Sequence, residues 1–184
     1  MSSTPMVVGL DLSMTSTGVA TIDELGQIVT LTEKSKGSRT DDLPTRRRRL
    51  RELADRIVAH TPGARLVAVE GPSFASTGSG THDRSGLWWL VVDSLMAAGT
   101  PVVIVPPATR MIYAAGAGNA GKDKVLASVV RRYFDVEVGG NDEADALVIA
   151  AIAARLIGRP VEESMPQSHL RAMAKLSLPA ATAA

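Results

Sequence analysis

The sequence predicts an α/β fold: a mixed sheet of five strands, three antiparallel and then parallel ones, flanked by helices. Two features of the chain predict this fold. Short apolar stretches rich in β-branched residues come first along the chain, and helical and strand-like segments then alternate. The composition, 45% hydrophobic and 21% charged, is ordinary for a globular domain. The 184 residues suit one domain, expected over residues 1–158, with a C-terminal tail carrying one short helix over residues 159–184.

The first three predicted strands are short and are separated by turn residues. We expect them at residues 6–10, 17–22 and 28–32. Polar residues 13–16 separate the first pair, and residues 24–26 separate the second pair. Connections this short favour antiparallel pairing of consecutive strands.

Helical and strand patterns alternate in the rest of the chain. Pro44 suits the first turn of a helix, and apolar residues recur behind it at helical spacing. Residues 73–85 are rich in Ser, Thr and Gly, which predicts a flexible loop. We expect helices at residues 43–60, 87–98, 108–115, 122–134 and 142–157, and buried parallel strands at residues 66–69 and 102–105.

The composition excludes several classes of site. The chain has no cysteine, which excludes disulfide scaffolds, thiolate zinc sites and cysteine nucleophiles, and fits a reducing compartment. No apolar run reaches the roughly 18–20 residues that span a bilayer. The first residues lack the basic and apolar segments of a secretion signal. We therefore expect a cytoplasmic protein without a membrane segment.

The charge is nearly balanced, but the basic residues are clustered. The net charge of +1 does not by itself indicate a nucleic-acid-binding protein, and the few aromatic residues offer no broad surface for base stacking. One cluster, which includes Arg46 and Arg47, lies at the start of a predicted helix, where cations oppose the helix dipole. This conflict suggests phosphate contacts, and a solvated helix face explains the cluster equally well. A second cluster includes Lys122 and Lys124.

Four acidic residues stand where the fold can bring them together. Asp11 ends the first predicted strand and Glu70 ends the fourth, so their carboxylates lie side by side if these strands are neighbours. Asp142 and Asp145 open the last predicted helix three residues apart, on one side of its first turn. Taken alone, a solvated strand end or an acidic group facing the helix dipole explains most of them. Neither explanation suits Asp145. The predicted helix that follows it is nearly apolar all round and therefore largely buried, and a buried carboxylate needs a partner.

Four carboxylates gathered at one place predict a cation among them, because they otherwise repel and raise one another's pKa. Mg²⁺ or Mn²⁺, which bind oxygen ligands, fits this set. Two such ions about 4 Å apart can activate water and stabilise the leaving oxygen in phosphodiester cleavage. We therefore expect a site with two Mg²⁺ or Mn²⁺ ions.

Several segments together resemble a known family, the RuvC-type Holliday-junction resolvases of the ribonuclease H-like superfamily. The matching segments, in the family's order, are Val-Gly-Leu-Asp at 8–11 with Thr17 and Gly18, Val-Ala-Val-Glu at 67–70, the glycine-rich residues 116–122, and Asp-Glu-Ala-Asp-Ala-Leu-Val-Ile-Ala at 142–150. The resemblance covers about residues 6–158. It implies a ribonuclease H-like fold and a homodimeric, metal-dependent endonuclease that nicks four-way DNA junctions symmetrically. The compact chain is most similar to phage-encoded relatives, which would act in the cytoplasm of a bacterial host.

The resemblance also implies roles for individual residues. Asp11, Glu70, Asp142 and Asp145 match the family's four metal-binding carboxylates. Lys122 matches a basic residue near the scissile phosphate. These five residues are the candidate catalytic residues.

Two positions depart from the family's pattern. A further lysine of the family, in the helix after the fifth strand, falls on Met111 here, with Arg110 beside it. The aromatic residue that follows the catalytic Glu, used by the family at the junction crossover, falls one residue late, at Phe74. Fold and metal chemistry therefore transfer better than junction specificity. The candidate DNA-binding residues are Arg110, Lys124, Phe74, Arg46 and Arg47.

Trp88 and Trp89 bear on the implied homodimer. They are adjacent on a predicted helix and cannot share one face, so we expect one in the core and the other at a subunit interface, where Trp is enriched. Symmetric cleavage of a two-fold junction needs two active sites and hence two copies of the chain.

Three short motifs also match nucleotide-binding patterns, and we reject each of them. Residues 116–122 fit the G-x-x-x-x-G-K phosphate loop, yet Asp123 stands where a Ser or Thr hydroxyl must bind Mg²⁺. Residues 142–145 spell the DEAD box of RNA helicases, but the chain is too short for two helicase lobes. Residues 9–18 resemble the first phosphate loop of actin-like ATPases, which need two such domains. We expect no nucleotide cofactor.

Two other functions remain open on the sequence alone. One is a protein that binds branched DNA with weak or no cleavage, and binding that survives loss of a carboxylate would identify it. The other is a nuclease of the same fold that acts on flaps or RNA–DNA hybrids, which a substrate panel at fixed salt would identify.

Overall fold

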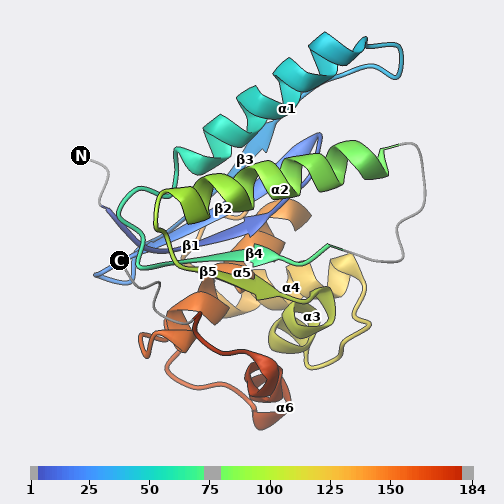
Figure 1. Cartoon of the computed structure of the whole chain (residues 1–184). Helices are drawn as coiled ribbons and strands as arrows, with labels where there is room; N and C mark the ends of the chain where they lie inside the picture. Colours follow the sequence, from blue (N-terminus) through green and yellow to red (C-terminus); the bar gives the residue numbers. More distant parts are fainter. Residues whose placement is uncertain (1–3, 73–79, 180–184) are drawn as a thin grey trace.

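The computed structural model describes residues 4–72 and 80–179, which form a five-stranded mixed sheet flanked by helices (Figure 1). The strands lie in the order β3-β2-β1-β4-β5. β1 pairs antiparallel with β2 and parallel with β4. The predicted fold class is therefore confirmed, and each predicted strand is present. The strands are β1 (Pro5–Asp11), β2 (Ser16–Asp23), β3 (Ile28–Lys34), β4 (Leu66–Glu70) and β5 (Val102–Val105).

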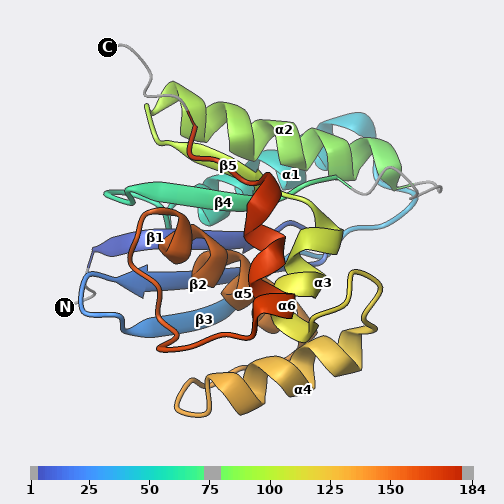
Figure 2. The ribbon, with the colours of Figure 1, turned by 90° about the horizontal axis from the view of Figure 1, so that it is seen from below.

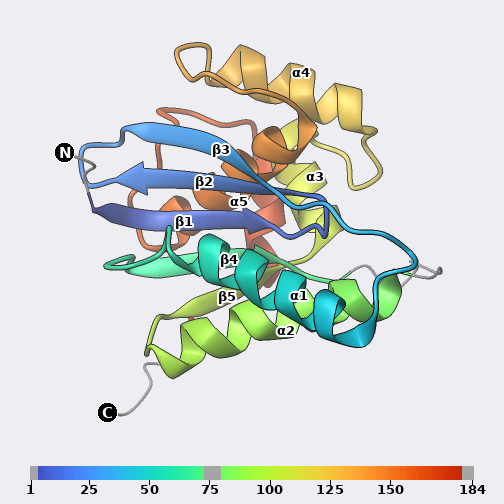
Figure 3. The same cartoon turned by 90° about the horizontal axis from the view of Figure 1, so that it is seen from above.

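Helices cover both faces of the sheet, and each face has its own apolar core. α1 (Leu43–Val58) and α2 (Thr81–Ala97) lie on one face (Figures 1 and 3). The other face carries the remaining helices, and Figure 2 shows the C-terminal ones lying across it. They are α3 (Pro107–Ala115), α4 (Lys122–Arg132), α5 (Asn141–Leu156), α6 (Gln167–Leu170) and the 3-10 helix η1 (Arg171–Lys175).

Two glycines let α5 lie directly on the sheet. A Cβ on Gly9 would stand 2.3 Å from the backbone oxygen of Ala146, and one on Gly18 would stand 1.9 Å from that of Asp142. Both distances are far below a van der Waals contact, so no larger residue fits either place. Every residue of α5 from 144 to 154 is buried. The close approach fixes the first turn of α5 beside the ends of β1 and β2.

α2 begins at Thr81, six residues before the start that the apolar pattern predicts. Residues 81–85, expected to belong to a loop, are therefore helical. The cause is tertiary: Arg46 of α1 donates from Nε and Nη2 to the carboxylate of Asp83, at 3.1 and 2.5 Å. A polar first turn held by an ion pair to another helix carries no apolar periodicity, so the sequence pattern misses it. None of the described helices is both long and apolar enough to cross a membrane.

The segment after α5 is held to the domain by one buried carboxylate. Glu162 accepts hydrogen bonds from the hydroxyls of Tyr113 and Tyr133 and from Nη2 of Arg155. These partners lie on α3, at the end of α4 and on α5, so Glu162 ties the chain to three helices at once. The beginning of the predicted tail is thus packed against the domain.

Candidate active site

The ends of β1 and β4 bring two of the predicted carboxylates together. In the parallel ladder Leu10 lies opposite Val69, so Asp11 and Glu70, one residue further on, reach the same edge of the sheet. Their carboxyl groups are close enough for the charge of Glu70 to raise the pKa of Asp11. The expectation that the first and fourth strands are neighbours is confirmed.

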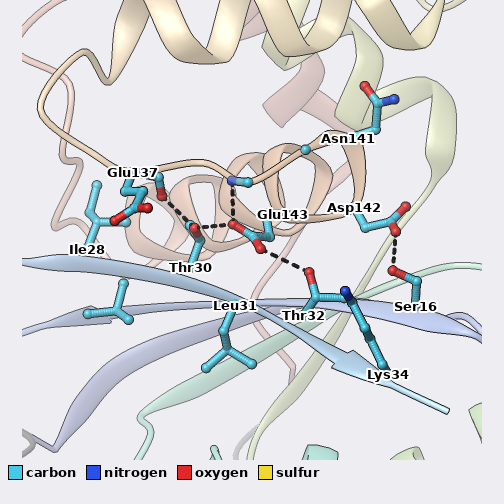
Figure 4. Close-up of a pocket in the computed structure, with 13 residues that line it drawn as sticks. Ser16, Ile28, Thr30, Leu31, Thr32, Lys34, Glu137, Asn141, Asp142 and Glu143 are labelled. Atoms are coloured by element: carbon cyan, nitrogen blue, oxygen red, sulfur yellow. Dashed lines mark hydrogen bonds between the residues drawn. The ribbon is translucent and has the colours of Figure 1, made fainter.

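α5 contributes the other two carboxylates from its first turns. Asp145 is buried, with only 5% of its side chain exposed, and its negative charge acts on Asp11. Asp142 lies one turn earlier and accepts a hydrogen bond of 2.5 Å from the hydroxyl of Ser16, which begins β2 (Figure 4). The structure therefore gathers the four predicted acidic residues at one end of the sheet, from three elements distant in sequence.

Arg110 lies between two of these carboxylates. Its Nε donates to Oε1 of Glu70 at 2.6 Å, and its Nη1 donates to Oδ1 of Asp145. The guanidinium comes from α3 and is only 11% exposed. The neighbouring Met111 packs against the apolar core instead. Arg110 is thus a counter-ion within the acidic cluster.

The pKa values of Asp11 and Asp145 are raised mainly by burial. Burial, followed by the charges of Glu70 and Asp145, raises the pKa of Asp11 well above its usual value. Burial also raises the pKa of Asp145 to about 6, against the opposing charge of Arg110. The charges of Arg110 and Lys122 oppose this shift at Asp145 and do not cancel it.

The donor set suits a hard divalent cation. All four predicted ligands offer carboxylate oxygens, the donors that Mg²⁺ and Mn²⁺ prefer. Within the described part of the chain, no three acidic or histidine side chains converge closely enough to hold an ion as they stand. The guanidinium of Arg110 occupies the space between Glu70 and Asp145.

A cleft of about 280 Å³ opens onto the acidic cluster. Asp11, Glu70 and Asp142 line it, together with Lys122 at the start of α4. Two further lining residues were not predicted: Arg84, which is exposed, and Trp88, whose Nε1 donates to the backbone oxygen of Glu70 at 3.0 Å. Arg84 falls in the stretch that the composition assigns to a loop, so only the helical start of α2 could have placed it here.

The remaining DNA-binding candidates that the structure describes do not line the cleft. Lys124 is exposed in the first turn of α4. Arg46 is paired with Asp83, whereas Arg47 is exposed. Phe74 lies outside the described residues.

Glu143, between the two predicted aspartates, holds the start of α5 in place. It accepts hydrogen bonds from the hydroxyls of Thr30 and Thr32 on β3 and from the backbone N–H of Gly139 (Figure 4). Although burial opposes it, these bonds keep the pKa of Glu143 below its usual value. The residue lines a groove of about 790 Å³ between β3 and α5. Its role depends on the register of β3, which the sequence pattern does not fix.

The comparisons with known proteins bear on the fold. No family model matches the chain, and no curated protein matches it significantly. The Thermus thermophilus RuvC structure aligns with a TM-score of 0.62 and 23% identity, over 83% of this chain and 96% of that one. T. thermophilus RuvC in complex with a Holliday junction substrate aligns with the same TM-score, at 21% identity and the same coverage. The yeast mitochondrial Holliday junction resolvase Ydc2 aligns with a TM-score of 0.49 and 15% identity, over 82% of this chain and 78% of that one. The chain therefore has the ribonuclease H-like fold of RuvC.

Proposed function

We propose that this protein is a metal-dependent endonuclease that cleaves phosphodiester bonds in branched DNA and resolves four-way junctions by symmetric nicking. One observation carries the proposal: Asp11, Glu70 and Asp145, from three separate elements, gather beside a cleft that Asp142 and Lys122 also line. The fold shared with T. thermophilus RuvC, which has been seen with a Holliday junction substrate, supports it.

In this proposal the acidic cluster holds Mg²⁺ or Mn²⁺, two ions per site. The ligands would be Asp11, Glu70, Asp142 and Asp145. When bound, the metal activates water and offsets the charge of the phosphate. Lys122 and Arg84, which both line the cleft, would bind the phosphate of the scissile strand. Ser16 and Glu143 would orient the ligands by fixing Asp142 and the first turn of α5.

The proposed partner for symmetric nicking is a second copy of the chain. Trp89 is 64% exposed and Met96 is 65% exposed. They are seven residues apart on α2 and so lie on the same side of the helix. Trp88, the neighbour of Trp89, packs against the core, and the two rings form a T-shaped contact with their centroids 5.0 Å apart. An exposed Trp and Met on one helix face suit a subunit interface, where both residue types are enriched.

A specific observation also favours a second function, a protein that binds branched DNA with little or no cleavage. Arg110 already neutralises part of the acidic cluster without any metal. A cluster satisfied in this way could serve stability alone, and the basic residues would then bind DNA that is not cut.

The test is cleavage of a labelled immobile four-way junction with Mg²⁺ and with Mn²⁺, beside linear duplex, flap and RNA–DNA hybrid substrates. Wild type is compared with Asp145→Asn. We expect paired symmetric nicks in the junction, lost in Asp145→Asn while junction binding persists. Binding without cleavage of any substrate in either metal would refute the nuclease and support the binding protein. Preferred cleavage of flaps or hybrids would keep the nuclease and change its substrate.

A further inference from the structure

The arginines at the start of α1 do not all serve the same purpose. Arg46 pairs with Asp83 and joins α1 to α2. Arg49 donates from Nη2 to the backbone oxygen of Met14 at 2.5 Å and from Nε to the hydroxyl of Ser35 at 2.8 Å. It therefore joins α1 to the turn after β1 and to the chain just after β3. The contacts of Arg46 and Arg49 therefore hold elements of the fold together.

Arg48 has no comparable structural role in the described part of the chain. It is exposed, and its one side-chain hydrogen bond is a long contact of 3.5 Å with Thr45 of its own helix. Lys36 lies just after β3 and is also exposed. It takes part in no hydrogen bond or ion pair among the described residues. Among the described residues, neither cation forms an ion pair, although the charge of Arg48 acts weakly on Asp42 of its own helix start.

These two residues belong to a basic hollow of about 360 Å³ between α1 and the end of β3. Five cations and two carboxylates line it, so positive charge is in excess. One of the carboxylates, Asp41, already accepts the backbone N–H of Ser38. We call Lys34, Lys36, Arg48 and Arg56 the α1 basic surface. Among these four, Arg56 is paired with Glu33 at 3.0 Å and is still 44% exposed.

The α1 basic surface lies at the same end of the sheet as the acidic cluster. Lys34, the last residue of β3, is opposite Ser16 in the β2–β3 ladder, and Ser16 donates to Asp142. Figure 3 shows the chain passing beyond this end of the sheet after β3, before α1 begins. DNA that enters the cleft and extends toward β3 therefore reaches this surface next.

We propose that the α1 basic surface binds the phosphate backbone of one duplex arm of the DNA substrate; this inference rests on the proposed function. From Arg48 to Arg56 the surface spans about 12 Å of helix, at 1.5 Å per residue. That length matches about three to four base pairs of duplex. None of the described residues that line the hollow is aromatic, so the contacts are to phosphates rather than to stacked bases.

Contacts to phosphates position a duplex without reading its sequence or its branching. The surface should therefore strengthen binding to a four-way junction and to a linear duplex alike. Branch specificity must come from other residues.

The test is a double charge reversal, Lys36→Glu with Arg48→Glu. The matched control is Arg131→Glu with Lys175→Glu, which changes the net charge equally at exposed positions on the helices of the opposite face. Affinity for a labelled junction and for a linear duplex is measured in EDTA over a range of salt concentrations. We expect the Lys36/Arg48 variant to bind both DNAs at least about tenfold more weakly near 0.1 M salt, with the salt slope reduced by about two. The control should bind like wild type.

Cleavage kinetics give a second readout. Because the α1 basic surface lies outside the acidic cleft, the Lys36/Arg48 variant should raise KM and leave kcat unchanged. If wild type binds and cleaves branched DNA while this variant binds like wild type, the inference is overturned and the proposed function stands. Equal loss in both variants also overturns it, because bulk charge then explains the effect. If wild type binds no branched DNA, the proposed function itself fails.

Discussion

At the scale of single residues, Arg110 is the main departure from a purely acidic metal site. Its guanidinium bonds both Glu70 and Asp145, and all three side chains are largely buried. A buried ion pair stabilises a fold weakly, but breaking it leaves uncompensated charge and is strongly destabilising. If the acidic cluster holds a metal ion, as proposed, that ion and Arg110 would be alternative partners for the same carboxylates. Arg110 would therefore stabilise the metal-free protein and compete with the proposed metal.

Replacing Arg110 with Met, which keeps the length of the side chain, should separate these two effects. We expect Arg110→Met to lower the free energy of unfolding by about 3 kcal/mol in EDTA, because Glu70 and Asp145 lose their cation. It should also bind Mn²⁺ about tenfold more tightly, since no guanidinium competes for the carboxylates. Unfolding with and without Mn²⁺, together with calorimetric titration, measures both. A loss of stability that Mn²⁺ does not reduce would mean that Arg110 is only structural.

The raised pKa of Asp145 predicts how the stability of the metal-free protein depends on pH. An aspartate has a pKa near 3.9 when unfolded and about 6 here, so between these values the folded state binds more protons than the unfolded state. Stability should therefore fall as pH rises from about 4 to about 7, by at most about 3 kcal/mol from this group. Denaturant unfolding in EDTA at several pH values measures this dependence. Asp145→Asn should weaken it strongly and Asp142→Asn only slightly, because burial and not the charge of Asp142 is the main cause of the raised pKa of Asp145; equal slopes in both variants would contradict the assignment.

At the scale of elements, the acidic cluster depends on how closely α5 lies on the sheet. Because Gly18 has no side chain, the backbone oxygen of Asp142 can lie where a Cβ would stand. Gly9 leaves the same room for the backbone oxygen of Ala146, one turn further along α5. Thr30 and Thr32 then fix Glu143, so the first turn of α5 is held from β2 and from β3. The position of the aspartates is thus a property of the packing between helix and sheet.

Gly18→Ala should therefore harm the site as well as the fold. The new Cβ would stand 1.9 Å from the backbone oxygen of Asp142, so the first turn of α5 must move. We expect a loss of about 1–3 kcal/mol in stability and weaker Mn²⁺ binding. Gly86→Ala is the control, because its Cβ meets only Leu50 at 3.9 Å and alanine favours a helix by up to about 1 kcal/mol. Thermal unfolding and metal titration of both variants test this, and an unaffected Gly18→Ala site would contradict it.

At the scale of the whole molecule, residues at the ends of regular elements could be predicted from the sequence. Asp11 and Glu70 follow short apolar strands, and parallel pairing alone places them together. Contacts that depend on side-chain reach between distant helices could not be predicted in this way. The hydrogen bond from Arg110 to Asp145 is of this kind. So is the ion pair between Arg46 and Asp83, which holds the first turn of α2. No periodicity encodes them, because each depends on the relative placement of two helices.

Assembly is the last property of the whole molecule that the structure makes testable. If symmetric nicking needs two copies joined through α2, placing a charge at the exposed Trp89 should separate them. We expect Trp89→Arg to sediment as a monomer where wild type sediments as a dimer, and to replace paired nicks in a junction by slow single nicks. Phe134→Arg is the matched control, since Phe134 is 86% exposed at the end of α4, on the other side of the sheet. A dimer that survives Trp89→Arg but not Phe134→Arg would move the interface to that side, and a monomeric wild type that still makes paired nicks would show that one chain acts twice.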